Sequence, residues 1–168
     1  MSNYFKNIYI LIIFSILLFI ISPANYGQNI SPKDVVSIKV KTDKTSDRTK
    51  TVNLEVVLSI KDGWHINANK PLDDYLTPTV VSINDTSKVR IVNEEYPVPS
   101  FVKLKFSQTQ LALYENEAIV KIKLKVKKGF KKSNLKLEGK VQYQPCNDQT
   151  CLFPVSKSFS FELRFKKS

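Results

Sequence analysis

The sequence has few of the residues that build metal centres. It contains two cysteines and one histidine among 168 residues. A structural zinc site usually takes four ligands from cysteine and histidine side chains. Cys146, Cys151 and His65 fall short of that number, so we expect no bound metal. His65 follows Trp64 in a strand-like stretch, where a packed or exposed histidine is more common than a catalytic base.

The N-terminal apolar run is too short to span a bilayer. It covers residues 8–21, about 14 residues, whereas a membrane-spanning helix needs roughly 20. A basic residue, Lys6, precedes it and the small or turn-forming residues 22–27 follow, which is the layout of a secretory signal. We therefore expect residues 1–27 to be an export signal, with an uncleaved anchor as the alternative. Residues 28–168 have the size of one domain, located in the periplasm or on the outer face of the cell membrane, where disulfides persist.

Acidic residues are scarce relative to basic ones. The chain has 26 Lys and Arg against 15 Asp and Glu, a formal net charge of +11. Nucleic-acid binding would need aromatic residues interleaved with a basic groove, and a compartment that holds nucleic acid. Export argues against this, so we expect no nucleic-acid partner. The lysines of residues 121–127 alternate with apolar residues, which keeps an outer strand face soluble; a docking face for an acidic partner is the alternative.

The chain lacks a helical hydrophobic stripe, and period-two alternation dominates instead. Alternation or short apolar runs predict strands at residues 36–40, 52–60, 80–83, 89–92, 122–126, 135–143 and 159–165. Gly139 is a candidate bulge. Residues 94–110 are less regular but contain apolar side chains, which favours a loop that packs onto the domain. Seven or eight strands in about 140 residues predict an all-β fold, an antiparallel β-sandwich.

The cysteine pair permits two interpretations, a structural bond and a redox centre. Bridging so short a loop removes roughly 2 kcal/mol of unfolded-chain entropy, against about 4–5 for a bond that spans a domain. This favours the redox centre. We expect Cys146 and Cys151 to lie on two antiparallel strand ends joined by a short loop, with Pro145 and Pro154 stiffening the flanks. The loop carries Asp148 and no basic residue, which predicts a thiol that is not activated until a partner docks.

Three sequence blocks resemble one known family. They are residues 62–71 (DGWHINANKP), the dipeptide Tyr96-Pro97, and residues 143–154 (YQPCNDQTCLFP). Their order and spacing are similar to the N-terminal periplasmic domain of the transmembrane thiol-disulfide reductase DsbD. The resemblance implies an immunoglobulin-like sandwich and protein-disulfide reduction by thiol-disulfide exchange. It also implies electron relay from a separate membrane thiol reductase to exported thioredoxin-like proteins, with no metal, nucleotide, flavin or other small-molecule cofactor.

The resemblance also implies roles for individual residues. Cys151 would form the mixed disulfide with a partner and Cys146 would resolve it. A cap loop with an aromatic side chain shields the pair in that family; Phe101 and Phe106 lie in the matching stretch, with Phe106 at the expected tip.

Pro145, Asp148, Trp64 and His65 would surround the site, and Asn67 stands where the family can have a tyrosine. One alternative is a non-catalytic exported binding module with a structural disulfide; another is an assembly factor that uses the lysine face.

Overall fold

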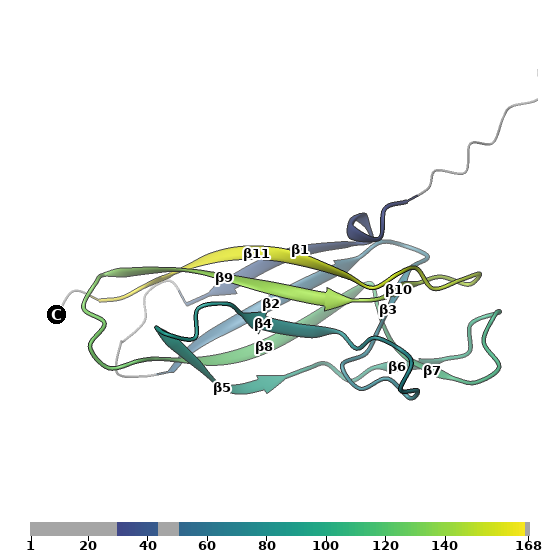
Figure 1. Cartoon of the computed structure of the whole chain (residues 1–168), viewed down its shortest axis with the longest axis horizontal. Helices are drawn as coiled ribbons and strands as arrows, with labels where there is room; N and C mark the ends of the chain where they lie inside the picture. The colour runs from purple at the N-terminus through teal and green to yellow at the C-terminus, as the bar shows by residue number, and fades with distance from the viewer. Residues whose placement is uncertain (1–29, 44–50, 167–168) are drawn as a thin grey trace, which may run out of the picture.

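The described part of the chain folds into three antiparallel sheets. The computed structural model describes residues 30–43 and 51–166, so the expected signal at residues 1–27 lies outside the described residues. The sheets have the strand orders β1-β2-β8-β5, β11-β9-β4 and β10-β3-β7-β6 (Figure 1). The elements are the 3-10 turn η1 (Pro32–Asp34) and the strands β1 (Val36–Thr42), β2 (Thr51–Ile60), β3 (His65–Asn67), β4 (Val80–Ile83), β5 (Val89–Glu95), β6 (Ser100–Val102), β7 (Leu111–Glu115), β8 (Glu117–Val126), β9 (Asn134–Tyr143), β10 (Pro145–Cys146) and β11 (Val155–Arg164).

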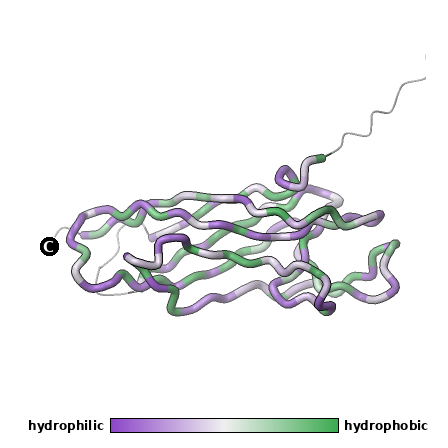
Figure 2. Tube along the Cα trace, in the orientation of Figure 1, coloured by the Kyte–Doolittle hydropathy of each residue, from purple (hydrophilic) through white to green (hydrophobic). Residues whose placement is uncertain are grey.

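The long strands form because their apolar residues alternate with polar ones. In β8 and β9 every second side chain is buried and the intervening ones are mostly exposed; Figure 2 shows the corresponding alternation of hydropathy along the chain. Successive side chains on a strand point to opposite faces, so each sheet gains one apolar face. The sheets β1-β2-β8-β5 and β11-β9-β4 enclose the main core with these faces. The prediction of an all-β antiparallel sandwich is confirmed.

The expected bulge at Gly139 is wrong. Gly139 lies opposite Phe159 on β11 and Ile83 on β4 without a register shift. A side chain at this position would collide with the Phe159 ring and with the Ser82 carbonyl. Glycine is therefore needed because the ring crosses the strand here. The register shift occurs instead in β5, between Ile91 and Asn93.

The short sheet β10-β3-β7-β6 lies at one end of the sandwich (Figure 1). Strand β7 is buried on both faces, because Ala112 and Tyr114 pack into the main core while Leu111 and Leu113 pack into a second cluster. The second cluster comprises Leu76, Leu104, Leu111, Leu113 and Cys146, with Val102 and Cys151 packed against it. Among the described residues, no helix has the length and hydrophobicity to cross a membrane. The second cluster places the cysteine pair beside, and not inside, the main core.

Candidate thiol-disulfide site

The two cysteines form a disulfide across a tight hairpin. Cys146 and Cys151 lie directly opposite each other as an antiparallel bridge, with their Cα atoms 4.0 Å apart and their sulfurs bonded at 2.01 Å. Cys146 ends β10, and the chain reverses over the next four residues before Cys151. This is the expected arrangement of two antiparallel strand ends joined by a short loop.

Hydrogen bonds hold the hairpin independently of the sulfurs. Outside the bridge, Leu152 N donates to Pro145 O at 2.8 Å; inside it, Asn147 N donates to Thr150 O at 2.9 Å. The Asn147 side-chain oxygen also accepts hydrogen bonds from the backbone N–H groups of Gln149 and Thr150, both at 2.9 Å. Asparagine favours such turns because its side chain can replace a backbone acceptor. These hydrogen bonds should keep the two sulfurs close together after the disulfide is reduced.

The two sulfurs differ in access. Cys146 is completely buried in the second cluster, whereas Cys151 is partly exposed. Cys151 also lines a cavity of about 410 Å³, together with Tyr75, Leu76, Phe106 and other residues. A thiolate approaching from solvent therefore reaches Cys151 before Cys146.

The loop between β6 and β7, residues 103–110, lies over the hairpin. Lys105 Nζ and Asp148 Oδ2 form an ion pair at 2.9 Å, which joins this loop to the turn between the cysteines. Phe106, 42% exposed, lines the cavity beside Cys151. Phe101 lies on β6, is 57% exposed and is not among the residues that line this cavity. The structure thus brings Phe106, but not Phe101, to the disulfide.

His65 and Trp64 face different surroundings. His65 on β3 lies directly opposite Cys146 on one side and Glu115 on the other. Its Nε2 is 3.3 Å from Glu115 Oε2, and its Nδ1 is buried without a hydrogen-bond partner. Trp64 packs against the main core instead. The structure thus brings His65 next to the cysteine pair and leaves Trp64 away from the second cluster.

A polar network beside the cysteines was not predicted from the sequence. Gln144 Oε1 accepts hydrogen bonds from Asn67 Nδ2 at 3.1 Å and from Thr77 N at 3.0 Å, and Gln144 Nε2 donates to Leu152 O at 3.2 Å. Asn67 is itself fully buried. The network ties the residue after Cys151 to strand β3 and the loop that follows it. The available signal was a polar glutamine between the apolar Tyr143 and Pro145.

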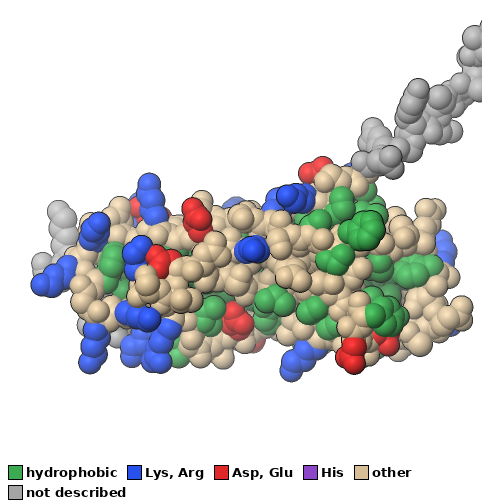
Figure 3. Space-filling model, in the orientation of Figure 1, with side chains coloured by type: hydrophobic (Ala, Val, Ile, Leu, Met, Phe, Trp, Pro, Cys, Tyr) green, Lys and Arg blue, Asp and Glu red, His purple; other side chains and the backbone are tan. Residues whose placement is uncertain are grey.

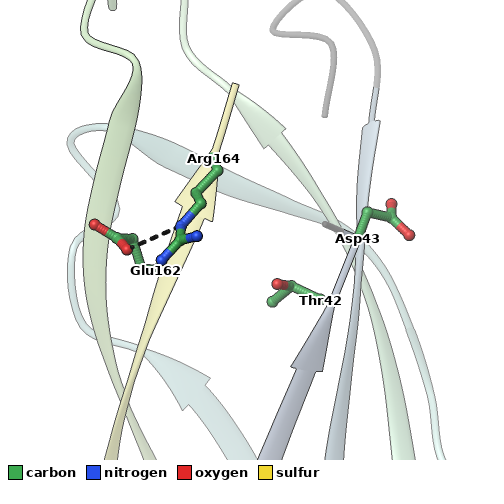
Figure 4. Close-up of a pocket in the computed structure, with 4 residues that line it drawn as sticks. All are labelled: Thr42, Asp43, Glu162 and Arg164. Atoms are coloured by element: carbon green, nitrogen blue, oxygen red, sulfur yellow. Dashed lines mark hydrogen bonds and ion pairs between the residues drawn. The ribbon is translucent and has the colours of Figure 1, made fainter. Parts of the chain in front are cut away.

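A further hollow lies at the opposite end of the sandwich and carries no comparable chemistry. Its volume is about 480 Å³, and Thr42, Asp43, Glu162 and Arg164 line it (Figure 4). Arg164 Nε pairs with Glu162 Oε2 at 3.3 Å, an exposed ion pair on one strand. Within residues 30–43 and 51–166, no three His, Cys, Asp or Glu side chains are grouped to hold a metal ion. The cysteine end is therefore the candidate site.

Comparison with known proteins gives a family match. Residues 30–163 match the family described as thiol:disulfide interchange protein DsbD, N-terminal. No curated protein matches the chain.

Two solved structures share the immunoglobulin-like fold at low sequence identity. The reduced N-terminal domain of DsbD from Neisseria meningitidis is 17% identical with a TM-score of 0.54, over 84% of this chain and 95% of that one. The N-terminal periplasmic domain of ScsB from Proteus mirabilis is 18% identical with a TM-score of 0.53. That match covers 80% of this chain and 49% of the ScsB chain.

Proposed function

The chain belongs to the family of DsbD N-terminal domains and is a thiol-disulfide interchange domain, and we propose that it relays reducing equivalents outside the cytoplasm. In this proposal a membrane thiol reductase reduces the Cys146–Cys151 disulfide, and the resulting dithiol reduces exported thioredoxin-like proteins. The export signal expected at residues 1–27 supports a periplasmic or outer-face location.

One observation carries the proposal: the single disulfide of the described residues has one buried and one accessible sulfur. A donor thiolate attacks Cys151 Sγ, the disulfide breaks, and Cys146 leaves with the electron pair and takes up a proton. A second donor thiolate then attacks the donor sulfur of the mixed disulfide and releases Cys151, which leaves the domain reduced by two electrons. In the forward transfer, Cys151 attacks the acceptor disulfide, and Cys146 then attacks Cys151 and releases the acceptor as a dithiol.

The surroundings of Cys151 support protection before docking and contact during it. Phe106 and the Lys105–Asp148 ion pair hold the β6–β7 loop beside the disulfide. Apolar side chains gather on the visible face at this end, whereas Lys and Arg gather at the other (Figure 3). Tyr75 is 77% exposed and Phe153 is 87% exposed, and both are close in sequence or space to Cys151. Large exposed aromatic residues of this kind favour a protein-binding surface.

The reduction potential tests the proposal against the structural-disulfide alternative. Equilibration with glutathione or dithiothreitol buffers should give a potential above about −300 mV, whereas a structural bond typically lies below that value. In addition, Cys146→Ser should retain disulfide-linked partners on Cys151, and Cys151→Ser is the matched control. Recovery of no covalent partner from Cys146→Ser, together with a potential below about −300 mV, would refute the exchange role.

Replacing Phe106 tests its shielding role. Because Phe106 lines the cavity next to Cys151, Phe106→Ala should accelerate reduction of the disulfide by a small dithiol. Phe101→Ala is the matched control, because Phe101 does not line that cavity. Equal rates of disulfide reduction in the wild type and Phe106→Ala would show that Phe106 does not shield the disulfide.

A further inference from the structure

His65 contains a buried hydrogen-bond acceptor that the oxidised site leaves unused. Its Nδ1 has no partner, while its Nε2 lies 3.3 Å from the Glu115 carboxylate. Buried polar atoms without a partner are uncommon in native structures and require an explanation. An atom that gains its partner only in another redox state of the site would provide one.

The contact with Glu115 favours one tautomer of the neutral His65 imidazole. A carboxylate only accepts hydrogen bonds, so the Glu115 oxygen 3.3 Å away favours a proton on Nε2 of His65. In the neutral ring the lone pair then belongs to Nδ1, since each nitrogen's role is set by what the other one binds. Glu115 thus acts as a positioning residue that keeps Nδ1 ready to accept a proton.

The sheet register puts Cys146 directly opposite His65. In the row across the sheet, His65 lies between Glu115 on β7 and Cys146 on β10. Directly opposite residues of antiparallel strands carry their side chains on the same face, with Cβ atoms about 4.5–5.5 Å apart. Because Nε2 lies near Glu115 on β7, Nδ1 is the ring nitrogen left available to Cys146 on β10.

Cys146 needs help in losing its proton. It is fully buried among leucines in the second cluster. Apolar surroundings disfavour a charged thiolate, yet the thiolate is the form that attacks a disulfide. Resolution of a mixed disulfide by Cys146 is therefore slow unless a neighbouring group accepts the proton.

We propose that His65 is the general base for Cys146, an inference that rests on the exchange function proposed above. In the mixed disulfide, the Cys146 thiol proton moves to His65 Nδ1 as Cys146 Sγ attacks Cys151 Sγ. The new Cys146–Cys151 bond forms, the bond between Cys151 and the partner breaks, and the partner sulfur leaves with the electron pair as a thiolate. Glu115 stabilises the positive charge on the ring, and the proton then passes to solvent or to the leaving thiolate.

The other charged groups nearby are directed elsewhere. Asp148 on the hairpin is paired with Lys105 of the β6–β7 loop at 2.9 Å. Lys61 and Asp62, in the turn before β3, are exposed to solvent. Glu115 on β7 and the cysteine pair are therefore the groups that face His65 from the strands packed against β3.

The reduced domain, mixed with the aromatic disulfide DTNB, separates the two steps. Attack by Cys151 releases one thionitrobenzoate at a rate that depends on DTNB concentration. Ring closure by Cys146 releases a second one at a rate that does not. We expect His65→Gln and His65→Phe to slow the second step about a hundredfold near neutral pH and to leave the first step unchanged. Glu115→Gln should slow the second step less, and Glu117→Gln is the matched control that should change neither.

The pH dependence distinguishes a base from a packing residue. The closure rate of the wild type should depend less steeply on pH than that of the His65 variants, in which only a Cys146 thiol already deprotonated by solvent can attack. Closure as fast in both His65 variants as in the wild type, or equal slowing of both steps, would overturn the role of His65. If the wild-type domain did not form the Cys146–Cys151 disulfide and release the second thionitrobenzoate, the exchange function itself would be overturned.

One further measurement needs no variant. The ¹⁵N resonance of His65 Nδ1 should show a new hydrogen bond when the disulfide is reduced, because Cys146 then provides the missing donor. An Nδ1 resonance that is identical in the oxidised and reduced domains would contradict the proposal.

Discussion

Reduction of the Cys146–Cys151 bond should weaken the domain only slightly. The bonded residues are separated by five positions in the chain, and closing a loop of that size removes about 2 kcal/mol of unfolded-chain entropy. A domain of this length has a free energy of unfolding of about 5–15 kcal/mol. The reduced protein should therefore remain folded, with its free energy of unfolding lowered by about 2 kcal/mol.

The structure gives two reasons why the loss should not be larger. The hairpin keeps the Leu152 N–Pro145 O bond of 2.8 Å and the Asn147 N–Thr150 O bond of 2.9 Å when the sulfurs separate. The main core, which packs the long strands, contains neither cysteine. The reduced form thus loses a covalent link but no large packed surface.

Urea unfolding, followed by the fluorescence of the single tryptophan, measures the change. The oxidised protein, the protein in reductant and the Cys146→Ser/Cys151→Ser variant should form one series with the same m-value. The variant controls for the reductant, because its midpoint should not respond to it. A loss above about 4 kcal/mol, the size expected of a domain-spanning bond, would refute the reasoning.

Three further predictions concern single residues. Lys105→Gln should make a small dithiol reduce the disulfide at most about fivefold faster, and only at low salt. The effect is small because an exposed ion pair contributes under about 1 kcal/mol. A larger increase that persisted at high salt would contradict this. Gly139→Ala should lower the free energy of unfolding by about 1–3 kcal/mol, measured in urea, because the new methyl group meets the Phe159 ring; unchanged stability would show that the ring moves freely. Burial, aided by the Asp34 carboxylate, raises the pKa of Tyr143 to about 12. The unfolded chain loses that proton near pH 10, so stability should fall by up to about 2–3 kcal/mol as pH rises from about 10 to 12, and Tyr143→Phe should lack this component.

The sequence predicts the strands that have one buried face. Residues 80–83 coincide with β4, and the alternating runs at 52–60 and 135–143 fall within β2 and β9. It does not predict β7, because residues 111–114 are all buried and show no alternation. Both faces of β7 are covered, one by the main core and one by the second cluster. A strand between two clusters loses the period-two pattern that identifies strands from sequence.

The cysteine hairpin was predictable, but its neighbours were not. The spacing of Cys146 and Cys151 already favours a bridge between two strand ends. The partners of Asp148 and His65, by contrast, are Lys105 and Glu115, which lie more than 40 positions away in the chain. Only the strand register and the fold of the β6–β7 loop bring these charges together. Residue spacing within one segment carries no information about such contacts.

We propose that the β6–β7 loop can move without unfolding the sandwich, because it packs on the second cluster and not on the main core. Leu104 and Leu111 flank the exposed part of the β6–β7 loop, and both are 2% exposed. Ser107 N also donates to Leu104 O at 3.0 Å, which closes a turn at the base of the loop. In this proposal residues 105–110 swing away from Cys151, while Leu104 and Leu111 stay buried at the two ends of the segment. Such a motion breaks the ion pair of Lys105 and the cavity contact of Phe106, while the main core keeps its packing. Under the proposed function, such an opening would expose Cys151 to a partner and leave Cys146 buried in the second cluster.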